Sequence, residues 1–144
     1  MNARSCREQL DWVPLSGYQL RKAGVQFDAV RIDGLGGRWA ADWLERMTDG
    51  EPGPVVSQVN GRRGVYFLCP PGSTGGRAWP SVAALFNGGA GRISYVPVPA
   101  LRGDTWPLTW RFPPREPGRF VHPLLLRSTV LALLALPDTP FGER

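Results

Sequence analysis

The sequence predicts a single α+β domain in which short strands form an antiparallel sheet and helices pack against it. Short β-rich runs alternate along the chain with segments of helical period. The 144 residues are enough to bury a core, and a hydrophobic share of 42% is ordinary for a globular protein. The 18 glycines and 15 prolines predict many turns between short elements, and the six tryptophans argue against a disordered chain.

The N-terminal half begins with a segment of no clear period and then gives a strand and a helix. Residues 1–24 are interpreted as an arm or a short helix, ahead of one domain over 25–137 and a tail over 138–144. Residues 27–32 read as a strand that the glycines at 34–37 end. A helix follows and ends near Gly50, because five apolar side chains share one helical stripe: Trp39, Ala40, Trp43, Leu44 and Met47.

The middle of the chain is expected to form a hairpin, because two β-rich runs, 55–59 and 65–69, flank Asn60-Gly61. Ser81 is expected to cap a short helix that runs through Phe86. A strand is predicted over 93–98, where Pro97 favours a place at the edge of a sheet.

The last third is expected to give another strand and a final helix. Trp106, Leu108, Trp110 and Phe112 alternate with other residues at a period of two, which predicts a strand with one aromatic face. Pro123 is expected to begin a helix that runs to about Leu136, with Pro137 as its stop.

Together these elements follow the order βαββαβ, with an additional strand and a C-terminal helix. This order is that of the ferredoxin-like arrangement, which RNA-recognition motifs share. In that arrangement both helices lie on one face of the sheet. The other face is then either exposed for binding or covered, and the additional strand and the apolar C-terminal helix are the elements that could cover it.

Charge is distributed unevenly along the chain. The formal net charge is +5, and residues 61–127 hold nine arginines against only Asp104 and Glu116. Such a region attracts phosphates or an acidic protein. Only Lys22 among the 17 basic residues is a lysine, however, and a GC-rich genome also produces this bias. The polar N-terminus predicts no signal peptide, and no run is long enough to span a membrane, so a cytoplasmic protein is expected.

The first functional hypothesis is a non-enzymatic, nucleic-acid-associated domain that binds DNA or RNA. Residues 63–68, RGVYFL, partly resemble the aromatic sequence of RNA-recognition motifs, whose aromatics stack bases. Alternatively, Tyr66 and Phe67 are ordinary core and surface residues of a hairpin. The candidate nucleic-acid-binding residues are Arg62, Arg63, Tyr66, Phe67, Arg77, Trp79, Arg92, Arg102 and Arg111.

Two further hypotheses compete with this one. In the first, the chain is a protein-interaction or regulatory module that self-associates or docks an acidic partner through Trp106, Trp110 and Phe112, or through the final helix. That helix is expected to be either deeply buried or part of an oligomer interface. In the last hypothesis, residues 34–38, which contain the glycine turn, bind a small phosphate ligand. The nucleotide fingerprint and the P-loop lysine are absent from this segment.

Signs of catalysis are weak, and no enzyme activity, cofactor or metal is predicted. Asp28 and Asp33 are five residues apart, which places them on opposite faces of a continuous strand. The single histidine, His122, is expected to cap a helix or to pack. Cys6 and Cys69 are too few for a disulfide scaffold or a zinc site and are interpreted as free thiols.

Taken whole, the chain resembles the N-terminal domain of bifunctional DNA primase/polymerases. The resemblance rests on FDAV at 27–30, GPVV at 53–56, VYFLCPPG at 65–72, YVPVP at 95–99 and WPLTW at 106–110. It implies a sheet like that of RNA-recognition motifs. The family places two metal-binding acids one residue apart on a strand, but here Val30 stands two residues after Asp28. The resemblance therefore implies a non-catalytic relative, with no catalytic residue carried over.

Overall fold

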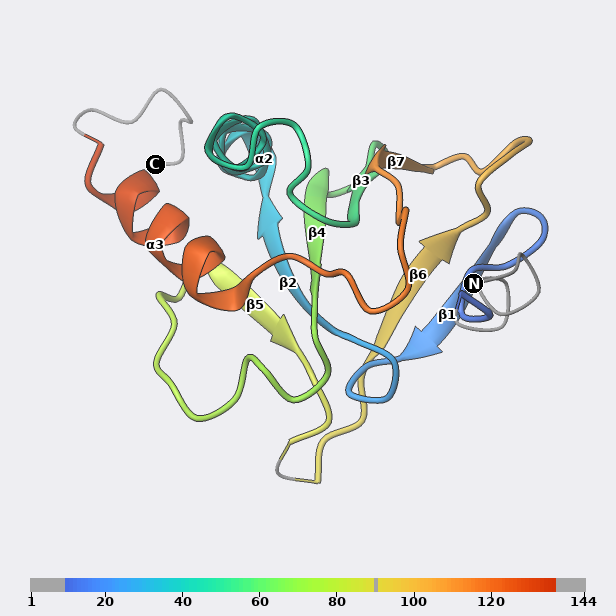
Figure 1. Cartoon of the computed structure of the whole chain (residues 1–144), viewed down its shortest axis with the longest axis horizontal. Helices are drawn as coiled ribbons and strands as arrows, with labels where there is room; N and C mark the ends of the chain where they lie inside the picture. The colour runs from blue at the N-terminus through green and yellow to red at the C-terminus, as the bar shows by residue number, and fades with distance from the viewer. Residues whose placement is uncertain (1–9, 90, 137–144) are drawn as a thin grey trace.

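A computed structural model describes residues 10–89 and 91–136 of the chain. It contains seven strands and two helices in these residues (Figure 1). In chain order they are β1 (Tyr18–Lys22), β2 (Asp28–Asp33), α2 (Gly34–Met47), β3 (Val55–Gln58), β4 (Gly64–Cys69), β5 (Ala83–Phe86), β6 (Tyr95–Pro99), β7 (Leu108–Phe112) and α3 (Pro123–Leu134). The predicted α+β class is confirmed.

Five strands form the main sheet in the order β5-β2-β4-β3-β7, and every neighbouring pair is antiparallel. Helix α2 connects β2 to β3, and β4 lies between these two strands. The predicted strand at 27–32, the helix that follows it and the β3–β4 hairpin are confirmed. Asn60 and Gly61, which predicted the hairpin, lie in the loop between the last paired residues, Gln58 and Gly64.

The glycines after β2 begin the helix and bring it close to the sheet. Gly34 has a φ of 68°, a left-handed conformation that favours glycine. A Cβ on Gly37 would lie 2.3 Å from the carbonyl oxygen of Ile32 and 3.1 Å from Val65 Cγ2. The missing side chain therefore lets the first turn of α2 pack directly on β2 and β4.

Both helices cover the same face of the main sheet. Ile32 and Phe67 of the sheet pack there with Leu44 of α2 and Leu126 of α3, and all four are fully buried. In Figure 1 the helices lie to the left of the sheet. His122 begins α3 as expected, because its Nδ1 accepts a hydrogen bond from the backbone N–H of Leu124 at 3.2 Å.

The opposite face is covered by a two-stranded ribbon, which β1 and β6 form by antiparallel pairing (Figure 1, right). Val96 and Val98 of β6 pack there with Trp12 and Phe27, whose rings meet edge to face at 5.2 Å. The interpretation that the additional strand and the final helix could cover this face is therefore wrong. The final helix lies beside α2, since both pack into the same core.

Three other expectations are corrected by pairing between distant segments. The helix predicted over 81–86 is wrong: residues 83–86 form β5, which pairs with the free edge of β2. The strand predicted over 93–98 forms as β6, but it pairs with β1 instead of joining the main sheet. Within the segment interpreted as an arm or short helix, residues 18–22 form β1, while residues 1–9 lie outside the described residues.

The aromatic face predicted over 106–112 is interrupted by a β-bulge. Val56 of β3 pairs with Trp110, but its neighbour Val55 pairs with Phe112, so Arg111 is the extra residue. Leu108 and Trp110 pack toward the ribbon, whereas Phe112 packs toward the helices. The bulge thus moves Phe112 to the other face of the sheet and turns Arg111 toward α2.

Helix α3 is buried along one side only. Leu126, Val130 and Leu133 lie in the core, whereas Leu124 and Leu131 are exposed. Within the described ranges, neither helix is long and apolar enough to cross a membrane.

Candidate functional site

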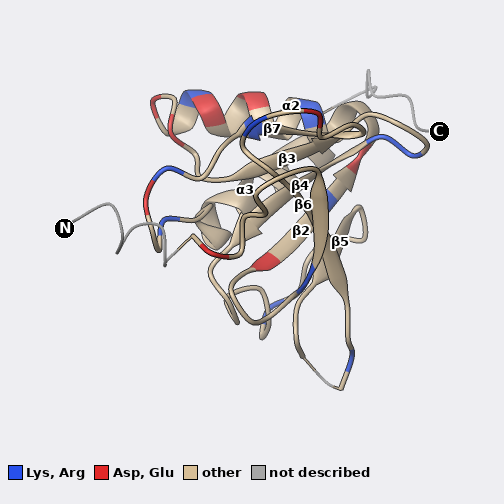
Figure 2. Cartoon of the chain, turned by 90° about the vertical axis from the view of Figure 1, so that its right-hand side faces the viewer, with Lys and Arg blue, Asp and Glu red and all other residues tan. Residues whose placement is uncertain are grey.

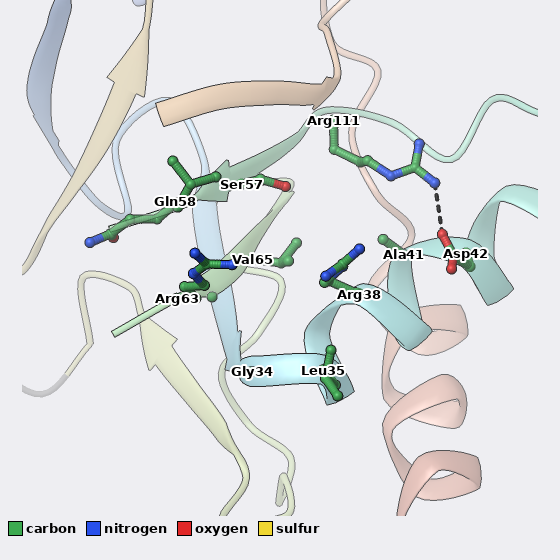
Figure 3. A pocket seen from close by; sticks show the side chains of 12 residues that line it. Gly34, Leu35, Arg38, Ala41, Asp42, Ser57, Gln58, Arg63, Val65 and Arg111 are labelled. Carbon is green, nitrogen blue, oxygen red and sulfur yellow. Dashed lines mark hydrogen bonds and ion pairs between the residues drawn. The ribbon is translucent and has the colours of Figure 1, made fainter. Parts of the chain in front are cut away.

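The candidate site is a cavity of about 570 Å³ between the start of α2 and the end of the main sheet where β3, β4 and β7 meet it (Figure 3). Gly34, Leu35 and Arg38 line it from α2, and Ser57 and Gln58 line it from β3. Arg63 enters from the β3–β4 loop and Arg111 from the bulge in β7. The volume lies within the range of small-molecule sites.

Two of the three arginines in the cavity have no acidic partner among the described residues. Arg38 and Arg63 are exposed and form no ion pair with any residue that the structure describes. In Figure 3 their guanidinium groups lie on either side of Val65. These side chains give the cavity its free positive charge.

Arg111, by contrast, is held by helix α2. Its Nη2 donates to Asp42 Oδ1 at 2.7 Å and to Glu45 Oε1 at 3.2 Å (Figure 3 draws the first bond). Burial alone lowers the pKa of the Arg111 guanidinium, but the hydrogen bonds with the two carboxylates hold that pKa above its ordinary value. Arg111 therefore ties β7 to α2 and forms one wall of the cavity.

Polar contacts hold the start of α2 in place beside the arginines. The N-cap residue Asp33 makes no side-chain capping bond; its carboxylate instead accepts from Arg31 Nε at 2.6 Å. The Gly34 N–H donates to the Arg63 carbonyl oxygen at 2.9 Å, which fixes the β3–β4 loop beside the helix. The N-terminal end of a helix carries partial positive charge, so it adds to the attraction of an anion.

An arginine-centred network supports the loop from the other face of the sheet. Arg31 Nη1 donates to Gln58 Oε1 at 2.8 Å and to the Tyr66 hydroxyl at 2.9 Å, and its Nη2 donates to the Arg62 carbonyl oxygen. A Cβ on Gly64 would lie 2.7 Å from Arg31 Nη2, so glycine makes room for this guanidinium. The network anchors the loop that carries Arg63.

The other candidate arginines lie apart from the cavity. Arg62 is exposed, and its Nη1 lies 3.6 Å from Asp33 Oδ2. Arg77, Arg92 and Arg102 are exposed on three separate loops. Figure 2 shows basic segments scattered over the loops, and basic and acidic positions mixed along α2. Of the predicted arginines, the structure brings together only Arg63 and Arg111 in the cavity, with Arg62 adjacent in sequence.

The hairpin aromatics that were expected to stack bases are buried in this structure. Phe67 is 0% exposed and lies between the sheet and the helices. Tyr66 is buried on the other face, where its ring packs edge to face on Phe86 at 5.6 Å. Trp79 is half-buried, and its Nε1 donates to the Thr74 carbonyl oxygen at 3.0 Å. A base needs an open ring face, which Phe67 and Tyr66 do not offer.

The three residues predicted as an interaction surface lie in different environments. Trp106 is 67% exposed. Trp110 is half-buried, packs near Trp12 with ring centres 6.3 Å apart, and donates from Nε1 to the Pro99 carbonyl oxygen. Phe112 packs against the core beneath the helices. They do not form one continuous face: Trp106 precedes β7, and the bulge places Phe112 on the other face of the sheet from Trp110.

Comparisons of the chain with protein-family models, with curated proteins and with solved structures found no match. The resemblance to the primase/polymerase domain therefore stays a prediction.

At the positions that carried this resemblance, the side chains serve the structure. Asp28 is fully buried, and its carboxylate accepts hydrogen bonds from the backbone of Gly72 and from the backbone and hydroxyl of Thr74. Val30 lies in the core. Within residues 10–89 and 91–136, no three His, Cys, Asp or Glu side chains come together to hold a metal ion.

Arg38 entered the sequence reasoning only as the end of the Gly34–Arg38 phosphate hypothesis, and Ser57 and Gln58 were not named as site residues. Arg38 ends the glycine-rich segment at 34–38 that suggested a phosphate turn, and this was the available signal. Its meeting with Arg63 was not visible in the sequence, because the two residues are brought together by the packing of α2 on β4.

Proposed function

We propose that this protein is a binding module for phosphate-bearing ligands, and that the ligand's phosphate occupies the cavity at the start of α2. The observation that carries the proposal is the pair of guanidinium groups, Arg38 and Arg63, which line one cavity from different elements and have no ion-pair partner among the described residues. Guanidinium groups bind phosphate oxygens through paired, charge-assisted hydrogen bonds. Two such guanidinium groups match a ligand that presents one or two phosphates.

Binding without chemistry is the form of the proposal that the lining residues favour. Asp42 is the one acidic residue among the described residues that line the cavity, and Arg111 already occupies its carboxylate. A general acid or base must be able to exchange its proton with a ligand. An accessory, non-enzymatic role is therefore proposed, in line with the weak signs of catalysis in the sequence.

The phosphate has two chemical sources, a small molecule and a nucleic-acid backbone. The arginines outside the cavity lie on separate loops, and the hairpin aromatics are buried; both facts favour a compact ligand over a long strand. A nucleic acid would contact many phosphates and give a steep dependence of affinity on salt, whereas a small ligand contacts few.

The experiment is a calorimetric titration of the full chain with four probes: pyrophosphate, a nucleoside triphosphate, a single-stranded oligonucleotide and a duplex. We expect Arg38→Gln and Arg63→Gln each to weaken binding about tenfold, because a hydrogen bond to a charged group contributes roughly 1.5 kcal/mol or more. Arg102→Gln is the matched control, since Arg102 is exposed, unpaired in the described chain and outside the cavity.

Each result has a defined meaning. Tight binding of the small probes supports the small-molecule source, and preferential binding of an oligonucleotide with a steep salt slope supports the nucleic-acid source. Binding that Arg102→Gln weakens as much as Arg38→Gln, or no binding of any probe at low salt, would overturn the proposal.

We also propose that the main sheet is a variant of the ferredoxin-like arrangement. The order β5-β2-β4-β3 and the α2 connection across β4 support this. Residues 70–82, where the second helix of that arrangement is expected, form a loop, and α3 lies beside α2 on the same face instead.

A further inference from the structure

The ribbon of β1 and β6 has an outer face that the rest of the described chain leaves uncovered. Alternate residues of a strand share a face, and Leu20 pairs with Pro97 while Lys22 pairs with Tyr95. We define the outer ribbon face as Tyr18, Leu20, Lys22, Tyr95 and Pro97. Leu20 is 59% exposed, and both tyrosines of this face are about half exposed.

Exposed apolar side chains are frequent in the segments that contain and flank the ribbon strands. Leu15 and Val25 flank β1 in the chain, and Ile93 and Leu101 flank β6. With the ribbon's own residues they make up seven of the fifteen exposed large hydrophobic side chains among the described residues. Exposed apolar side chains at this frequency indicate an interaction surface, because isolated soluble proteins rarely expose large apolar patches.

The ribbon strands carry charge of one sign. Strands β1 and β6 hold Arg21 and Lys22 and no Asp or Glu, Arg92 and Arg102 lie in the loops beside β6, and the nearest acids along the described chain are the exposed Asp11 and Asp104 and the buried Asp28. Docking of a second copy through this face would bring like charges together. A partner that is apolar in the middle and acidic at its margins complements both properties.

Strand β1 also offers backbone groups for binding. It pairs along one edge only, with β6, as far as the described residues extend, and in Figure 1 it is the outermost strand of the ribbon. An unpaired strand edge presents N–H and C=O groups that an extended peptide matches and a lipid surface does not.

We propose that the β1–β6 ribbon docks an extended, acidic segment of a partner protein, which adds to the free edge of β1. Apolar side chains of the segment contact Tyr18 and Leu20, and its carboxylates meet Lys22 and the loop arginines. This surface is separate from the arginine cavity, which is lined by α2, β3, β4 and their neighbours.

The test is a fluorescence-anisotropy titration of the full chain with a labelled ten-residue peptide that has valines in the middle and glutamates at both ends, beside the same peptide with Lys in place of Glu. We expect the acidic peptide to bind, the basic one not to bind, and Lys22→Glu to weaken the acidic peptide at least fivefold. The peptide should also slow amide hydrogen exchange in β1.

Leu20→Asn should weaken binding at least fivefold, and the matched control is Leu134→Asn, because Leu134 is 54% exposed on α3, away from the ribbon. Arg38→Gln should leave peptide binding unchanged, which separates this proposal from the phosphate site.

Three outcomes would overturn the proposal. The first is an acidic peptide that fails to bind or that binds Leu20→Asn unchanged. The second is binding to vesicles of phosphatidylcholine and phosphatidylserine that Leu20→Asn removes, which would assign the face to a membrane surface. The third is a dimer in light scattering that Leu20→Asn dissociates, which would assign the face to a second copy.

Discussion

The carboxylate of Asp28 accepts a hydrogen bond from the Thr74 hydroxyl at 2.7 Å, although the two residues are 46 positions apart in the chain. The same carboxylate accepts from the backbone N–H of Thr74 at 3.1 Å and of Gly72 at 3.0 Å. Asn87 completes the arrangement by donating from Nδ2 to the Thr74 hydroxyl. A buried acid at the start of β2 thus fixes the loop that follows β4.

We predict that Asp28→Asn lowers the free energy of unfolding by about 2–3 kcal/mol. The amide removes the charge and turns an N–H donor toward groups that are themselves donors, and hydrogen bonds to charged groups carry about 1.5–3 kcal/mol. Urea unfolding gives the free energy, and hydrogen exchange should show lost protection at Gly72 and Thr74. Asp11→Asn, at an exposed aspartate, is the control. Unchanged protection at both amides would show that Asp28 does not hold the loop.

Truncation should lower the free energy of unfolding strongly at Phe67 and hardly at all at Trp106. Phe67→Ala is expected to cost about 3–5 kcal/mol of stability, because it opens a cavity between the sheet and the helices. Trp106→Ala, at a side chain that is 67% exposed, should change stability by no more than about 0.5 kcal/mol. Chemical denaturation measures both.

The milder variant Phe67→Leu distinguishes a core role from a binding role. It should lower stability by less than Phe67→Ala and leave the affinity for every phosphate probe unchanged. A Phe67→Leu protein of normal stability that lost affinity for an oligonucleotide would restore the base-stacking hypothesis.

Cys69 should make stability depend on pH in the alkaline range. Burial, and after it the charge of Asp28, raises the pKa of the Cys69 thiol well above its ordinary value. The folded chain therefore keeps this proton while the unfolded chain releases it above an ordinary thiol pKa of about 8.5. Stability is fully present below that pH and falls above it, by up to ~1.4 kcal/mol per pH unit.

The measurement is urea unfolding at several pH values in a Cys6→Ser background, which leaves one thiol. Cys69→Ala in that background should remove the thiol's contribution to the slope of unfolding free energy against pH. A thiol reagent should label Cys69 only as fast as the protein opens. Equal slopes with and without Cys69, or rapid labelling of the folded chain, would contradict the prediction.

Elements that depend on neighbours in the sequence were predicted well. The apolar stripe of α2, the hairpin around Asn60-Gly61 and the cap at His122 were all visible as local patterns. Each is fixed by interactions over a few residues, such as a shared helical face or a tight turn. The glycine turn at 34–38 lies where the proposed phosphate cavity is found.

Elements that depend on distant partners were not predicted correctly. Residues 83–86 are a strand because β2 has a free edge there, and residues 95–99 leave the main sheet because β1 pairs with them. The bulge at Arg111 exists only in the register between β3 and β7.

The sequence by itself determined the α+β class, the charge distribution and the local elements, because these follow from composition and from periods of two and 3.6 residues. Only the tertiary structure decided which face each aromatic ring occupies, which strands pair, and that Arg38 and Arg63 line one cavity. The physical reason is that strand pairing and side-chain burial join residues far apart in the chain, and such contacts leave no periodic trace in either segment alone.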